Sequence, residues 1–141
     1  MKPKLLLRIA SIVMLLHTVG HTLGALTWKQ APNDTIAKVV QGMEQNYFDF
    51  LGRQVSLGML FQGYGVEMIF VLLLLVSILW LLGNFIENLL SQKLLPLLFF
   101  FLVCFAACEW IYFFPVPAIM SSIAALLVLI AYLGSKKKER M

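Results

Sequence analysis

Four ionisable side chains stand inside apolar stretches of this 141-residue chain, where a charge is costly. His17 and His21 are four residues apart, a spacing that puts both imidazoles on one face of a helix. Glu67 and Glu109 occur in two further apolar stretches. Imidazole and carboxylate groups exchange protons and bind metal ions, so these four residues are the first candidates for a functional site.

Four apolar runs must position these side chains, and each has the length of a membrane-spanning helix. The chain is 61% hydrophobic and 13% charged, with a mean hydropathy of +0.90, which is more apolar than a soluble domain of this size can bury. Backbone groups in lipid are satisfied within helices. We therefore predict an all-α, single-domain bundle of four transmembrane helices over residues 1–141, with spans at about 5–26, 60–82, 94–114 and 117–133.

Two details of these spans matter for the site. The first run follows basic residues, as a secretory signal does, but it is longer than the apolar part of a signal and holds two histidines. We expect it to be retained as a helix. Pro96 falls at the beginning of the third run, where proline is tolerated in the first turn, so we expect that helix to begin near it.

The loop over about residues 27–59 is the only sizeable segment outside the predicted spans. Asn33 or Asp34 can cap a helix there, and apolar residues then recur at helical spacing at Ile36, Val39, Val40, Met43 and Tyr47. This pattern predicts a short amphipathic helix on the outer leaflet, either as a lid or as a cover for loop backbone. Phe48, Phe50 and Arg53 then predict an aromatic anchor before the second span, with Asp49 and Arg53 close enough to pair.

Lysine and arginine residues are unevenly distributed between the two predicted sides of the membrane. Eight of the eleven lie in segments that share a side with the termini, whereas Lys29, Lys38 and Arg53 lie in the first loop. Because positively charged segments stay in the cytoplasm, this bias predicts that both termini are cytoplasmic. The basic residues near the C-terminus predict contact with membrane lipids rather than with nucleic acid.

The predicted spans bring the four ionisable side chains to a similar depth. With a rise of about 1.5 Å per residue, His21 and Glu109 each lie about 8 Å below the outer end of their span. Glu67 lies about 10 Å and His17 about 14 Å below theirs. Because buried charges usually pair, we expect the four to meet in an outer-leaflet pocket. The candidate ligand-binding residues near that level are Tyr64, Tyr112, Gln62 and Cys108.

Several functions fit such a cluster, and the sequence leaves them open. The leading prediction is binding of a small lipophilic molecule, with or without acid–base conversion, so the sequence does not decide whether the chain is an enzyme. Glu67 or Glu109 would be the proton donor or base, and a histidine its partner. The main alternative is a Zn or Fe site made by His17, His21, Glu67 and Glu109. The others are a structural or accessory membrane subunit and a proton-coupled carrier, which would need a homodimer.

Three segments carry a resemblance to a known family: residues 17–22 (His-Thr-Val-Gly-His-Thr), 49–53 (Asp-Phe-Leu-Gly-Arg) and 63–67 (Gly-Tyr-Gly-Val-Glu). The chain resembles a group of small, uncharacterised bacterial four-helix membrane proteins with a His-Thr-x-Gly-His-Thr signature, over most of its length. The resemblance implies a four-helix inner-membrane protein and carries no activity, cofactor or catalytic residue. A looser likeness to DoxX-like proteins covers the four-helix architecture alone.

Overall fold

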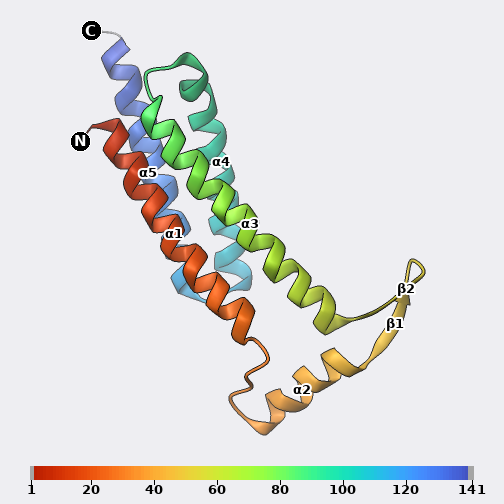
Figure 1. Cartoon of the computed structure of the whole chain (residues 1–141). Coiled ribbons are helices and arrows are strands. Elements are labelled where there is room, and N and C mark those ends of the chain that lie inside the picture. Colours follow the sequence, from red (N-terminus) through yellow and green to blue (C-terminus); the bar gives the residue numbers. More distant parts are fainter. Residues whose placement is uncertain (1, 140–141) are drawn as a thin grey trace. The chain divides into compact units, whose positions relative to one another are not determined.

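The computed structural model describes residues 2–139, and most of them are helical (Figure 1). Four of the described helices are long and apolar enough to cross a membrane, which confirms the predicted all-α architecture. The elements in chain order are α1 (Pro3–Thr27), α2 (Asp34–Gln45), β1 (Tyr47–Phe50), β2 (Arg53–Ser56), α3 (Leu57–Asn84), α4 (Leu89–Tyr112) and α5 (Pro115–Glu139).

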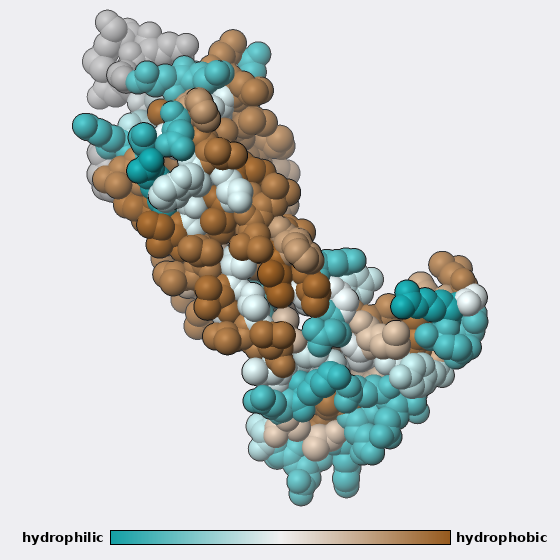
Figure 2. Space-filling view, viewed as in Figure 1, coloured by the Kyte–Doolittle hydropathy of each residue, from teal (hydrophilic) through white to brown (hydrophobic). Residues whose placement is uncertain are grey.

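Large apolar side chains are exposed along all four long helices. Each of the following exposes more than half of its surface, one from each helix: Leu16, Phe70, Phe100 and Leu126. Figure 2 shows hydrophobic side chains over the flanks of these helices and hydrophilic ones around α2. Soluble surfaces seldom carry such large apolar areas, whereas lipid covers them without cost. The helices are therefore compatible with an integral, multi-pass membrane protein.

The described chain forms two compact units, and the division falls within α1 and α3. Unit 1 comprises residues 2–18 and 72–139, and unit 2 comprises residues 19–71. Unit 1 holds the larger apolar core, whose fully buried side chains recur at helical spacing. They are Leu7, Met14, Leu72, Leu79, Leu95, Leu102 and Val128.

Both ends of the described chain lie at the same end of unit 1 (Figure 1). A Cβ atom built on Gly134 would lie 3.3 Å from Cγ of Pro3, so the beginning of α1 packs against the last turns of α5. In the same unit, Oγ of Ser11 donates a hydrogen bond to the carbonyl of Val76 in α3, at 2.9 Å. The assignment of this end to the cytoplasm remains a prediction from the charge distribution.

Helix α4 begins at Leu89, well before the predicted start near Pro96. Asn88 is the N-cap, and its Oδ1 accepts a hydrogen bond from the backbone N–H of Leu90 at 2.8 Å. Pro96 therefore lies inside the helix, where it removes one backbone hydrogen bond. The predicted start was wrong because the capping signal of Asn88 outweighs the preference of proline for a first turn.

The predicted amphipathic helix of the first loop is present as α2. Oδ1 of Asn33 caps it by accepting the N–H of Ile36 at 3.0 Å, and no residue of the helix is buried. An ion pair between Lys29 and Glu44 joins the preceding loop to this helix.

A β-hairpin follows α2, where we expected only an aromatic anchor. β1 and β2 pair antiparallel, with a turn in which Leu51 and Gly52 have φ angles of 54° and 82°. The predicted pair of Asp49 and Arg53 is wrong, because the register places Asp49 opposite Gln54. The Asp49 carboxylate instead accepts the N–H of Gly52 at 3.2 Å. The three aromatic residues among positions 47–50, a residue type enriched in strands, were the strand signal.

Candidate functional site

The structure brings His17 and Glu109 together inside unit 1. Nε2 of His17 lies 3.2 Å from Oε1 of Glu109, and the two side chains are only 6% and 7% exposed. Helix α1 supplies the histidine and α4 supplies the glutamate. A lone charge at this position would be costly, so each group offsets the cost of burying the other.

The spacing of the buried residues in α4 explains why Glu109 points inward. The helix buries one side chain every three or four residues, which is the repeat of a single helix face. The buried stripe consists of Ser91, Leu95, Leu98, Leu102, Ala106 and Glu109. Glu109 therefore continues an otherwise apolar packing face rather than standing on an exposed one.

Ser121 of α5 joins this pair and brings a third helix to the site. Its Oγ lies 3.3 Å from Nδ1 of His17, and the residue is fully buried. Both ring nitrogens of His17 thus have a hydrogen-bond partner, which fixes the plane of the imidazole. The ring of Phe105 lies 6.0 Å from the imidazole, between centroids, and covers one of its sides.

The hydrogen bonds allow two arrangements of one proton that leave the pair without net charge. In the first, the Glu109 carboxyl group is protonated and donates to Nε2 of a neutral His17. In the second, the proton has moved to Nε2, and an imidazolium faces a carboxylate. Nδ1–H donates to Oγ of Ser121 in both arrangements. The proton can therefore shift by one short step without creating a net buried charge.

The second carboxylate oxygen of Glu109 is buried and lacks a hydrogen-bond partner among the described residues. Buried polar atoms without a partner are rare, and they often mark a place that a water molecule, an ion or a ligand occupies. Oε2 is therefore the atom of the pair whose capacity to accept a hydrogen bond is unused among the described residues.

His21 has a different environment, in unit 2. Its Nε2 lies 2.9 Å from the backbone carbonyl oxygen of Gly65 in α3. Because a carbonyl oxygen only accepts, Nε2 of His21 carries a hydrogen and donates it. The amide of Gln62 is engaged nearby: its Oε1 accepts from the indole of Trp28 at 2.7 Å, and its Nε2 donates to the carbonyl of Ala25 at 3.3 Å.

The remaining predicted site residues are exposed. Glu67 and Tyr64 are exposed on α3 in unit 2, and Cys108 and Tyr112 are exposed on α4 in unit 1. The predicted pocket that joins all four ionisable residues draws on both units and stays a prediction. Among the described residues, no group of three or more His, Cys, Asp or Glu side chains could hold a metal ion. The Zn or Fe site likewise stays a prediction.

Sequence analysis did not include Ser121 in the site. Its signal was the packing stripe of α5, where small residues recur every three or four positions at Ala118, Ser121 and Ala125, all of them buried. A hydroxyl on such a stripe, about 9 Å from the beginning of the helix, was within reach of the depth predicted for the histidines and glutamates.

No protein-family model matches this chain, and neither a curated protein nor a solved structure is significantly similar to it. The resemblance of residues 17–22, 49–53 and 63–67 to small bacterial four-helix membrane proteins therefore stays an expectation from the sequence.

Proposed function

We propose that the protein binds a small lipophilic molecule within the membrane and exchanges a proton with it at the His17–Glu109 pair. The observation that carries this proposal is a buried carboxyl group with one oxygen 3.2 Å from an imidazole nitrogen and the other without a partner among the described residues. An interhelical polar contact stabilises a membrane protein by roughly 1 kcal/mol, which is less than the free-energy cost of burying an ionisable group. A purely structural role therefore explains this carboxyl group poorly.

The chemistry follows from the two oxygens of Glu109. A polar hydrogen or a lone pair of the ligand would bind at Oε2, while Oε1 keeps its contact with His17. When Glu109 gives its proton to the ligand, His17 stabilises the carboxylate by donating Nε2–H to it. When the proton returns, the neutral pair is restored. Ser121 holds the imidazole in the orientation that both states need.

The position of the pair favours a ligand that is dissolved in the bilayer. Glu109 is one turn from the end of α4 at Tyr112, which corresponds to about 5 Å along the helix. A molecule that reaches Oε2 must therefore enter near the end of the span, among apolar side chains. We place this end in the outer leaflet of a bacterial inner membrane, because the lysine and arginine distribution assigns the opposite end to the cytoplasm.

The test compares ligand and stability in the same samples. Protein purified in mild detergent is extracted with organic solvent, and the co-purified lipophilic molecules are measured by mass spectrometry. Glu109→Gln keeps the shape of the side chain but removes its exchangeable acid, so we expect the specific ligand to be lost or reduced about tenfold, an effect of about 1.4 kcal/mol. Glu44→Gln is the matched control, because Glu44 lies in α2, outside the spans.

The structural alternative predicts the reverse pattern. If Glu109→Gln and His17→Gln lower the melting temperature while every co-purified molecule stays at its wild-type level, the pair only ties α1, α4 and α5 together. If no lipophilic molecule co-purifies with the wild type above the level found with an unrelated four-span protein, the proposal is also wrong.

A further inference from the structure

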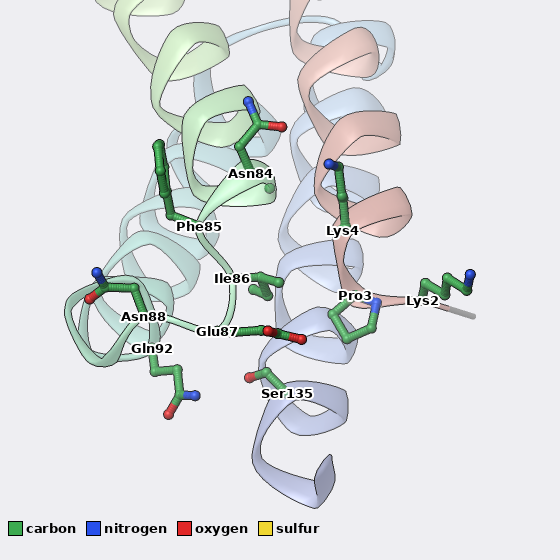
Figure 3. A pocket seen from close by; sticks show the side chains of 11 residues that line it. Lys2, Pro3, Lys4, Asn84, Phe85, Ile86, Glu87, Asn88, Gln92 and Ser135 are labelled. Carbon is green, nitrogen blue, oxygen red and sulfur yellow. The ribbon is translucent and has the colours of Figure 1, made fainter. Parts of the chain in front are cut away.

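A cavity opens at the end of unit 1 where the ends of its helices meet (Figure 3). Its volume of about 870 Å³ falls within the range of about 300–1,000 Å³ that is typical of ligand sites. Pro3, Asn84 and Ser135 line the cavity. Pro3 is the first residue of α1 and Asn84 the last residue of α3. Ser135 is next to Lys136, where the apolar span of α5 ends. Because the spans end there, the cavity lies at the depth of lipid headgroups.

The cavity is lined by charges of both signs. Lys2 and Lys4 supply ammonium groups from the beginning of the chain, and Glu87 supplies a carboxylate from the connection between α3 and α4. In Figure 3, the Glu87 side chain extends toward Pro3 and Ser135. A simple anion would meet the carboxylate, and a simple cation would meet the lysines. A ligand with separate positive and negative groups matches this lining better than either.

Neutral hydrogen-bond donors line the same space. Gln92 and Asn84 contribute two amides, whose NH₂ groups bind phosphate oxygens well, whereas the hydroxyl of Ser135 already donates to the carbonyl of Tyr132 at 2.8 Å. Arg8 holds one of these amides: its Nη2 donates to Oδ1 of Asn84 at 3.1 Å, so the amide NH₂ of Asn84 is not used in this contact. The guanidinium of Arg8 is itself held over the ring of Trp80, 4.7 Å from its centroid.

Apolar side chains form another part of the wall. Phe85 and Ile86 line the cavity in the segment that connects α3 to α4. They offer a surface for glycerol and the first methylene groups of acyl chains, which a soluble phosphate compound would not use. The lining therefore pairs a polar, doubly charged part with an apolar part, which is the division that a phospholipid has at the membrane surface.

We infer that this cavity binds a phospholipid whose headgroup carries both a phosphate and a primary amine. In this arrangement Lys4 and the amide donors bind the phosphate, and Glu87 binds the ammonium group. The site is separate from the proposed proton-exchange site, because Lys4 and His17 are about 20 Å apart along α1. The two proposals therefore stand or fall independently.

Native mass spectrometry of the full chain tests this inference. The protein is released from nanodiscs that contain equal parts of phosphatidylethanolamine and phosphatidylglycerol, and the lipids that stay bound are counted. We expect the wild type to retain phosphatidylethanolamine preferentially. Lys4→Gln lowers retention of both lipids by about fivefold, the effect of one interfacial lysine. Glu87→Gln removes the preference for the amine-bearing lipid and leaves total retention similar.

Two controls separate the site from general attraction to the membrane. Lys93 lies next to the lining residue Gln92 but is exposed and outside the set that lines the cavity, so Lys93→Gln keeps wild-type retention. Lys4→Arg keeps the positive charge, so we expect it to retain lipid like the wild type. The melting temperatures of Lys4→Gln and Lys4→Arg are measured alongside, to show that both variants are folded. Inorganic phosphate in excess leaves the lipid in place.

Several results would overturn the inference. Equal losses in Lys4→Gln and Lys93→Gln would mean non-specific attraction to the surface. An unchanged lipid preference in Glu87→Gln would remove the role of the amine. Displacement of the lipid by inorganic phosphate alone would identify a phosphate site instead of a lipid site.

Discussion

The two histidines of α1 belong to different units and have partners of different chemistry. In unit 1, Nε2 of His17 faces a carboxylate oxygen of Glu109, which can give or take a proton. In unit 2, Nε2 of His21 faces the carbonyl oxygen of Gly65, which can only accept a hydrogen bond. Two identical side chains one helical turn apart therefore differ in whether the partner of Nε2 can itself exchange a proton.

The same difference separates the two glutamates of the spans. Glu109 is buried on the packing stripe of α4, whereas Glu67 is exposed on α3. Because its neighbours in the fold surround it, the buried glutamate depends on the hydrogen-bond partner that the fold supplies, which is His17. Position on a packing face, more than residue type, therefore distinguishes the candidate site.

The largest expected effect separates the two histidines. His17→Ala leaves Glu109 buried without its partner and lowers the free energy of unfolding by about 3 kcal/mol. His21→Ala removes one hydrogen bond to a backbone carbonyl and costs only about 1 kcal/mol. Unfolding by denaturing detergent in mixed micelles measures both. Equal losses of unfolding free energy in the two variants would show that His17 and His21 contribute to stability in the same way, contrary to this expectation.

Replacing both members of the pair by leucine measures how strongly the two side chains interact. The double variant His17→Leu, Glu109→Leu leaves neither member of the pair buried without the other. Its loss of stability is therefore smaller, by about 2 kcal/mol, than the sum of the losses in the single variants His17→Leu and Glu109→Leu. The same detergent titration completes this double-mutant cycle. Strictly additive losses would show that the two side chains do not interact.

Two neighbouring serines of α5 give a smaller, matched contrast. Ser121→Ala removes the partner of Nδ1 of His17 and lowers stability by about 1 kcal/mol. Ser122 donates to the carbonyl of Ala118 in its own helix at 2.7 Å and accepts from the indole N–H of Trp110 at 3.3 Å, an exposed contact. Ser122→Ala therefore leaves no buried group without a partner and changes stability by less than about 0.5 kcal/mol. If the two serines have the same effect in thermal melts, Ser121 does not position the imidazole.

The smallest expected effect concerns the exposed glutamate. Glu67→Gln changes an exposed carboxylate into an amide of the same shape, and we expect a stability change within about 0.5 kcal/mol. A loss above about 1 kcal/mol in the same melts would instead support the predicted pocket of four ionisable residues.

Hydropathy and helical periodicity predicted the four long helices, their approximate positions and the amphipathic helix α2, because each depends on a local pattern. The β-hairpin over 47–56 was missed, since two four-residue strands give a weak alternating signal next to a helical one. The start of α4 was misplaced because a capping asparagine and a nearby proline gave competing signals.

The candidate site could be predicted in part. The depth argument placed His17 and Glu109 in one predicted pocket with His21 and Glu67, and the structure brings the first two into contact. It did not find Ser121, because a serine within a span is inexpensive and gives no comparable signal. The hydrogen bond from His21 to the backbone carbonyl of Gly65 depends on how α1 and α3 pack, which no residue pattern encodes.

The central claim is that the His17–Glu109 pair holds an exchangeable proton, and infrared difference spectroscopy tests it most directly. The protein in nanodiscs is titrated from about pH 4 to pH 10, the range that covers free carboxyl and imidazole groups. We predict a carboxyl absorption band that changes with pH, is absent in Glu109→Gln, is shifted in His17→Gln and is unaffected by Glu67→Gln. A spectrum in which no pH-dependent carboxyl band disappears with Glu109→Gln would contradict the account.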